Sequence, residues 1–393
     1  MKRIELLSPA GDLERLYVTL LYGADAVYIG GKEFSLRANA VNFSIEDIKK
    51  GCSFAHKLNK KVYLTLNMVF HNNDYLNVYK YIKDVVDAGI DAFIISDLYL
   101  ANYIKKNHKN VEVHISTQLS TTNYLTVEYF KNNNIDRVVL ARELSIDEIK
   151  EIIDKTNMDI EVFLHGAMCT SISGRCALSK YVTNRDANRG GCSQVCRFSF
   201  KNNNLKDFTM ASCDLNLSKY INELIDAKVT SLKVEGRMRS LYYLATVISS
   251  YRMLIDDYYE NKLSDDEKNK IYKRLESVSN RKSTIQFFKG NISENDQYYT
   301  GRQELSNQEF LGLITGYDEI NKQIVMLERN YFKKGDLVEI FTPSGKIYNM
   351  RIDNIINSKD EIVDVANHPD EELKIPFDYK IEAYSMMRKI EDK

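Results

Sequence analysis

The chain has 393 residues and a formal net charge of -1, with 44% hydrophobic and 28% charged residues. This length predicts two to three domains, or one large domain with an appendage. The composition is that of an ordinary globular protein, not a disordered or fibrous one. No apolar run approaches the roughly 20 residues that a membrane span needs, and the N-terminal run is too short for a secretory signal. We therefore expect a cytoplasmic protein without a membrane segment.

Eight short apolar runs alternate with amphipathic segments of helical period in the first part of the chain. Helix start signals lie between them, because Ser44 and Ser240 stand as N-caps and Ser145 and Glu148 have the spacing of a capping box. Alternating strands and helices indicate a parallel sheet, and eight pairs favour a closed (β/α)8 barrel of the TIM type over an open sheet. The eight runs begin at Ile4, Ala26, Lys61, Ala92, Glu112, Arg137, Ile160 and Ser231.

The spacing of the predicted strands and helices divides the chain into three segments. Residues 1–260 are predicted to form the barrel, interrupted by an insertion over residues 167–216 between the seventh and eighth strands. Residues 261–308 read as a charged helical segment followed by a polar linker. In a barrel, the insertion leaves the C-terminal end of its strand, which is the face where active sites are built.

The last segment, residues 309–393, has another pattern. Apolar runs that start at Phe310, Gln323, Asp336 and Ile347, with a further run KIEAYS from Lys380, are separated by turn-forming sequences. Short strands of this kind predict a small antiparallel β-barrel or sandwich.

Four of the six cysteines lie within 28 residues of the insertion. In a reducing compartment, such clustering points to metal binding or redox work more than to disulfides. Soft thiolates select zinc, copper(I) or iron-sulfur clusters, and the uneven spacing suits a 4Fe-4S cluster somewhat better than a zinc ribbon without deciding between them. The alternative is small buried residues or a redox-sensing pair. The four are Cys169, Cys176, Cys192 and Cys196.

The other two cysteines are given lesser roles. Cys52 lies in an amphipathic segment and is expected in the core. Cys213 follows the cluster as a spare ligand or a residue without a role.

The stretch 165–201, most of which belongs to the insertion, is also strongly basic, with six cationic residues against the single acid Asp186. Arginine forks beside flexible glycines suit phosphate or carboxylate binding, so contact with an anionic substrate or RNA is one interpretation and a solvated face is the other. The six are Arg175, Lys180, Arg185, Arg189, Arg197 and Lys201.

Polar residues also end the predicted strands, where the barrel mouth would lie. His165 could act as proton donor, substrate ligand or structural histidine. Glu235, Arg237 and Arg239 could bind an anionic substrate or form an ion-pair network that closes the barrel. The other polar strand ends are Ser8, Asn67, Ser96, Ser116, Thr117, Gln118, Arg142 and Glu143.

Several stretches carry a family resemblance: ELLSPAGDLERL near the start, EVFLHGAMCTSISGRCALS at 161–179, NRGGCSQVCR at 188–197, SLKVEGRMRSLYY at 231–243, and QEFLGLITGYD in the last segment. Through them the chain resembles the collagenase-like peptidase family, peptidase family U32, over essentially its whole length. The C-terminal β-domain makes it most similar to the branch of that family that hydroxylates tRNA.

The resemblance implies an iron-sulfur enzyme that uses prephenate to hydroxylate the tRNA wobble uridine to 5-hydroxyuridine. Catalysis would then fall to His165, Glu235 and Arg237, with the carboxylates of prephenate meeting Arg237 or Arg239. Substrate RNA would contact the cations of the insertion together with Arg239. Alternatives are a hydroxylase of ribosomal RNA, a non-catalytic zinc or RNA-binding module, and a peptidase in which Cys169 and His165 form a nucleophile and base pair.

The resemblance also implies cluster ligands and partners. Cys169, Cys176 and Cys192 would bind the 4Fe-4S cluster, and the position where many relatives carry another cysteine holds Asn216 here. Cys196 is favoured as the fourth ligand, with Cys213 as the substitute. Expected partners are the tRNA anticodon loop and the iron-sulfur assembly machinery, and a paralogous partner is left open.

Overall fold

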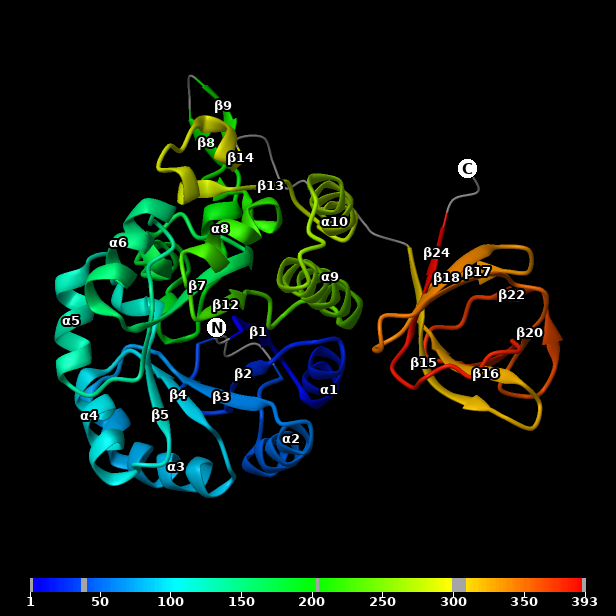
Figure 1. Cartoon of the computed structure of the whole chain (residues 1–393), viewed down its shortest axis with the longest axis horizontal. Coiled ribbons are helices and arrows are strands. Elements are labelled where there is room, and N and C mark those ends of the chain that lie inside the picture. The colour runs from blue at the N-terminus through cyan, green and yellow to red at the C-terminus, as the bar shows by residue number, and fades with distance from the viewer. Residues whose placement is uncertain (1–2, 37–40, 203–204, 299–308, 391–393) are drawn as a thin grey trace. The chain divides into compact units, whose positions relative to one another are not determined.

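A computed structural model describes residues 3–36, 41–202, 205–298 and 309–390 of the chain (Figure 1). The chain divides into two compact units, residues 1–20 with 24–304 and residues 21–23 with 305–393. The linker expected before the second unit includes residues 299–308, which lie outside the described residues. No helix in the described parts of the chain is long and apolar enough to cross a membrane.

The first unit is a closed parallel barrel, as the sequence predicts. Each strand pairs in parallel with its neighbour, and β12 pairs with both β7 and β1 to close the cylinder. The barrel strands are β1 (Glu5–Pro9), β2 (Ala26–Gly30), β3 (Lys61–Leu66), β4 (Ala92–Ile95), β5 (Glu112–Ile115), β6 (Arg137–Val139), β7 (Asp159–Gly166) and β12 (Ser231–Val234).

Helices follow the strands and surround the barrel (Figure 1). Their predicted starts are confirmed, because Ser44 and Ser145 form capping boxes and the Ser240 side chain accepts the backbone N–H of Tyr243. These helices are α1 (Leu13–Leu21), α2 (Ile45–Lys57), α3 (Tyr75–Asp87), α4 (Leu98–Asn107), α5 (Tyr124–Asn132), α6 (Ile146–Thr156), α8 (Ile221–Asp226) and α9 (Leu241–Tyr259), with α10 (Asp265–Ser277) after them.

The insertion between β7 and β12 has little regular structure. Its strand β11 (Asp214–Asn216) pairs antiparallel with the end of β7 and parallel with β13 (Ser283–Thr284), which extends the sheet beyond the barrel. The insertion's other elements are the 3₁₀ turns η3 (Ile172–Gly174), η4 (Ala187–Arg189) and η5 (Val195–Arg197), the short helix α7 (Leu178–Thr183), and strands β8 (Phe200–Asn202), β9 (Leu205–Phe208) and β10 (Ala211–Ser212). β10 pairs with β14 (Gln297–Tyr298).

The second unit is an antiparallel β-structure with its own apolar core, as predicted. The expected strand at Lys380 is wrong, since the chain turns at Tyr384, whose φ is +67°, and the strand begins at Met386. Its strands are β15 (Phe310–Asp318), β16 (Gln323–Glu328), β17 (Phe332–Lys333), β18 (Leu337–Phe341), β19 (Ile347–Arg351), β20 (Ile355–Ile356), β21 (Ile362–Val363), β22 (Val365–Ala366), β23 (Glu372–Pro376) and β24 (Met386–Lys389).

Candidate active site at the barrel mouth

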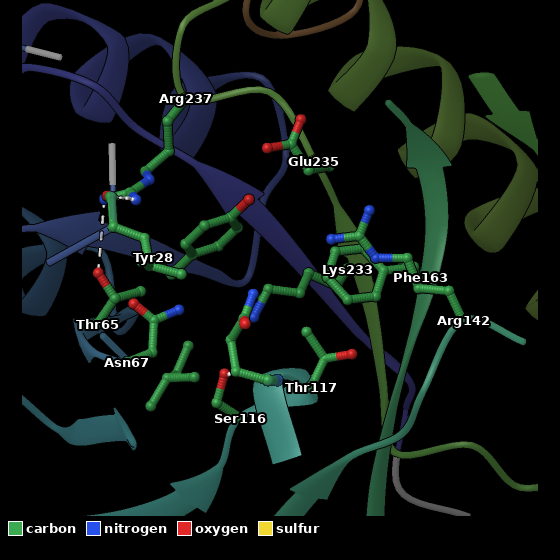
Figure 2. Close-up of a pocket in the computed structure, with 13 residues that line it drawn as sticks. Tyr28, Thr65, Asn67, Ser116, Thr117, Arg142, Phe163, Lys233, Glu235 and Arg237 are labelled. Carbon is green, nitrogen blue, oxygen red and sulfur yellow. Dashed lines mark hydrogen bonds between the residues drawn. The ribbon is translucent and has the colours of Figure 1, made fainter. Parts of the chain in front are cut away.

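A cavity of about 60 Å³, partly open to solvent, lies at the C-terminal end of the barrel strands (Figure 2). Seven of the polar or charged strand-end residues singled out in the sequence meet there. The lining residues are Tyr28, Leu36, Thr65, Asn67, Ile94, Ser116, Thr117, Gln118, Arg142, Phe163, Lys233, Glu235 and Arg237.

Among the residues that the structure describes, three cations line this cavity beside one carboxylate, that of Glu235. The guanidinium of Arg142 lies 4.0 Å from the centre of the Phe163 ring and donates to the carbonyl of Ala167 at 2.8 Å. Because positive charges outnumber negative ones on its wall, the cavity suits a small anionic ligand.

Arg237 is positioned by the wall on the other side. Its guanidinium donates to Ser35 Oγ at 3.1 Å, to Thr65 Oγ1 at 3.5 Å and to the carbonyl of Leu36. A methyl group on Gly30 would stand 2.0 Å from Nη1 of Arg237, so only glycine leaves room for this side chain.

Lys233 extends into the cavity from within strand β12 (Figure 2). Its Nζ lies 4.4 Å from the centre of the Tyr28 ring and 2.7 Å from Oε1 of Glu161. Burial lowers the pKa of Lys233, and Arg137 and Arg142 lower it further, against the opposing effect of Glu161. Lys233 is not among the residues singled out from the sequence, although a lysine inside an apolar barrel strand was the available signal.

His165 is not among the residues that line the cavity. Its Nδ1 lies 3.1 Å from the hydroxyl of Tyr251, and its ring packs near Tyr243 of α9. Burial lowers its pKa to about 3, with Arg239 contributing, so the imidazole is neutral at physiological pH. The adjacent Gly166 has φ +114°, and a methyl group there would stand 2.4 Å from the carbonyl oxygen of Glu235. The HGA turn therefore serves close packing of β7 against the end of β12.

The insertion is held on the barrel by side chains from two βα loops. Arg189 binds Asp74 through two hydrogen bonds of 2.6 and 2.9 Å and also donates to the carbonyl of Val69. Glu143 accepts the backbone N–H and the hydroxyl of Ser173 at 2.7 and 2.8 Å. These contacts fix the insertion over the mouth.

The predicted cation set separates into two groups. Arg175, Lys180 and Arg185 are exposed. Arg189 is bound to Asp74, and Arg239 donates to Asp214 at 2.8 Å, where Arg281 binds as well. Arg197 is half-buried, and burial together with Arg281 lowers its pKa.

The four cysteines of the insertion are free thiols, exposed or half-buried, while Cys52 and Cys213 are buried. Burial raises the pKa of the Cys196 thiol, and Cys169, Cys192 and Cys176 raise it further, while Arg197 opposes the rise. This mutual influence means that the four thiols share one region, and soft thiols are donors that fit an iron-sulfur cluster. In the described part of the chain, however, no three His, Cys, Asp or Glu side chains stand at metal-binding spacing.

The Cys169 thiol also lies beside the cavity. A methyl group built on Gly174 would stand 3.8 Å from Sγ of Cys169 and 3.0 Å from Nε2 of Gln118, which lines the cavity. Asn188 fixes the next cysteine, since its amide accepts from the N–H of Cys176 at 3.1 Å and donates to the carbonyl of Cys176 at 3.0 Å. The cysteine region and the cavity are therefore adjacent.

Fold and site together define a (β/α)8-barrel protein with a cysteine-bearing insertion over its mouth. The chain belongs to Peptidase family U32, whose pattern it matches over residues 11–298. Residues 306–388 match the Peptidase family U32 C-terminal domain.

Three relatives represent the activities named within this family. The chain is 39% identical to tRNA hydroxylation protein P1 of Bacillus subtilis, over 99% of this chain and 95% of that protein. It is 36% identical to the 23S rRNA 5-hydroxycytidine C2501 synthase of Escherichia coli, over 66% of this chain and 40% of that protein. It is 34% identical to a collagenase of Porphyromonas gingivalis, over 70% of this chain and 71% of that protein.

Proposed function

We propose that the protein is an iron-sulfur enzyme that hydroxylates the wobble uridine of tRNA to 5-hydroxyuridine with prephenate as co-substrate. The observation that carries this proposal is the adjacency of the Cys169 thiol and the cation-lined cavity across Gly174. Similarity to a tRNA hydroxylation protein over 99% of the chain supports tRNA as the substrate.

In this proposal the four insertion cysteines hold a 4Fe-4S cluster, with Cys196 as the fourth ligand. Such a cluster, when bound, supplies one-electron transfer. Cys213 is the weaker candidate because it is fully buried, with its Sγ 3.7 Å from the carbonyl of Asn295. Asn188 positions Cys176 through its two backbone hydrogen bonds.

In this proposal the cavity at the barrel mouth binds prephenate. Arg142 and Arg237 are placed on its wall to bind carboxylates, and bidentate guanidinium pairs are among the strongest such contacts. Arg239, the other candidate for this role in the sequence, is held by Asp214 and does not line the cavity. We therefore assign prephenate to Arg142 and Arg237.

The RNA contacts the exposed cations of the insertion, Arg175, Lys180 and Arg185. An anticodon loop is single-stranded, so its bases can leave their stack at low cost. Phosphate contacts from these side chains would orient the loop over the mouth without reading its sequence.

Nucleoside mass spectrometry of tRNA from a strain lacking the gene tests this function. We expect 5-hydroxyuridine and its derivatives to disappear and to return with the wild-type gene but not with Cys169→Ser. Unchanged 5-hydroxyuridine in a strain without a second copy would reject the proposal, and a loss confined to ribosomal RNA would reassign the substrate. Iron and sulfide analysis of anaerobically purified protein tests the cluster separately.

A peptidase remains the second candidate because of the collagenase relative. It requires a base beside Cys169, and His165 does not fit that role: it is 3% exposed and its Nδ1 is bound to Tyr251. Cleavage of gelatin by purified protein, lost in Cys169→Ala, would favour the peptidase.

A further inference from the structure

The cavity floor holds a lysine in a setting that suits covalent chemistry. Lys233 is 5% exposed, yet it lines the cavity, so its amine faces the ligand space and little bulk water. The rings of Tyr28 and Phe163 flank the amine, with their centres 4.4 and 5.7 Å from Nζ. An amine surrounded by apolar groups and other cations loses its proton more readily than an exposed one, which makes it a nucleophile.

Glu161 is the carboxylate that lies within hydrogen-bond distance of the Lys233 amine. Its carboxylate is fully buried and accepts from Lys233 at 2.7 Å and from Arg137 at 3.3 Å. Because Arg137 also donates to Glu161, the carboxylate keeps a cationic partner while Lys233 reacts. A carboxylate within hydrogen-bond distance of a nucleophilic amine meets the geometric requirement for a general base.

The remaining cations of the cavity supply recognition. Arg142 and Arg237 lie on the wall, and a carboxylate bound there would place an adjacent carbonyl in the space that Lys233 reaches (Figure 2). We propose that Lys233 forms an imine with a 2-oxo carboxylic acid bound in this cavity. The inference deepens the proposed function, on which it rests for the identity of the acid, because prephenate carries a 2-oxo carboxylate group.

The step balances without a further reactant. The amine of Lys233 adds to the carbonyl carbon, the carbonyl oxygen leaves as water, and a carbon–nitrogen double bond replaces the carbon–oxygen double bond. No electrons are gained or lost. When the ammonium form enters and the protonated imine results, two protons depart with the water and the positive charge beside Glu161 is kept. The ion pair in the barrel is therefore preserved in the product.

Reductive trapping tests the inference on the full-length protein. Phenylpyruvate with sodium cyanoborohydride should reduce the imine to a stable secondary amine on Lys233, which blocks tryptic cleavage there and joins the peptides on either side, residues 229–233 and 234–237. We expect this label to form faster than at the exposed Lys201, since a lysine whose pKa is lowered has a larger fraction of free amine at a given pH. Phenyllactate, which lacks the carbonyl, should compete.

Two variants sharpen the result. Lys233→Arg keeps the cation but cannot form an imine, so the label should vanish from this segment, whereas Lys201→Arg should leave it unchanged. Labelling of Lys201 and Lys233 at equal rates in the wild type would overturn the inference, and so would phenylpyruvate binding by calorimetry without any label on Lys233. Both readouts use the wild type, so a misfolded variant does not obscure them. Neither needs RNA, so loss of the proposed tRNA activity would be a separate result.

Discussion

The two ends of the barrel interior use charged residues in different ways. At the lower end, where the strands begin, Glu5 accepts hydrogen bonds from Arg137 at 2.6 Å, Tyr63 at 2.7 Å and Ser231 at 2.7 Å. These groups are bound to one another and fill the interior. At the mouth, charged and hydroxyl side chains line a cavity instead. Lys233 and Glu161 lie between these two ends. Glu161 accepts from both Arg137 and Lys233, so the network of Glu5, Tyr63, Arg137 and Ser231, here called the lower network, holds in place the lysine that lines the cavity.

The lower network should dominate stability. Arg137→Met leaves the carboxylates of Glu5 and Glu161 without their shared cation, and breaking a buried pair in this way costs about 3–5 kcal/mol. Denaturant unfolding should show this loss. The exposed pair Lys83–Asp87 is the control, since Lys83→Met should leave the free energy of unfolding almost unchanged. Equal effects of the two variants would contradict the distinction between the ends of the barrel.

Ligand binding at the barrel mouth should be sensitive to a single methyl group added at Gly30. Gly30→Ala puts a carbon against Arg237 and Ser35 Oγ, and overpacking of this kind costs about 1–3 kcal/mol. Because Arg237 must move, we expect the loss in free energy of phenylpyruvate binding, measured by calorimetry, to exceed the loss in free energy of unfolding. Gly316→Ala, where a methyl group meets no atom within 4 Å, is the control. Unaltered affinity in a folded Gly30→Ala protein would remove Arg237 from the ligand site.

The cysteine region should depend on Asn188. Asn188→Ala removes two hydrogen bonds to the backbone of Cys176, each contributing about 0.5–1.5 kcal/mol. We expect lower iron content per chain after anaerobic purification, with the barrel still folded by circular dichroism. Ser199→Ala, an exposed polar residue in the same insertion, should retain the iron of the wild type. Identical iron in both variants would mean that Asn188 does not position the ligand.

RNA binding should give the smallest effect per residue. Each of Arg175→Gln, Lys180→Gln and Arg185→Gln should reduce the salt slope of tRNA binding by about 0.7–0.9. Residues 309–393 carry twelve Lys and Arg against seventeen Asp and Glu, so this domain is acidic, and Lys346→Gln in it should leave the slope unchanged. A larger change with Lys346→Gln than with Arg175→Gln would move the RNA contact to the C-terminal domain. Filter binding at several salt concentrations measures these slopes.

The sequence predicts the barrel well because each strand and helix carries a local signal. Apolar runs mark the strands, and Ser44, Ser145 and Ser240 mark helix starts that the structure confirms. Strand ends also indicate the mouth, since Arg142 and Glu235 reach the cavity as their positions suggest.

The roles of individual site residues are harder to predict, because they depend on partners distant in sequence. Arg189 and Arg175 look alike in the chain, but only the position of Asp74, 115 residues away, shows that Arg189 fastens the insertion. Likewise, nothing near His165 in sequence announces Tyr251 on α9. Lys233 gains its setting from Tyr28, Phe163 and Glu161, which come from other strands.

Reconstituted hydroxylation tests the central claim, that thiols and cavity form one site, most directly. Anaerobically purified protein is given unmodified tRNA with or without prephenate, and 5-hydroxyuridine is measured by mass spectrometry. We expect product only with prephenate, and none from either Cys169→Ser or Arg142→Gln, which alter the cysteine region and the cavity separately. Product formed without prephenate, or full activity in either variant, would contradict the central claim.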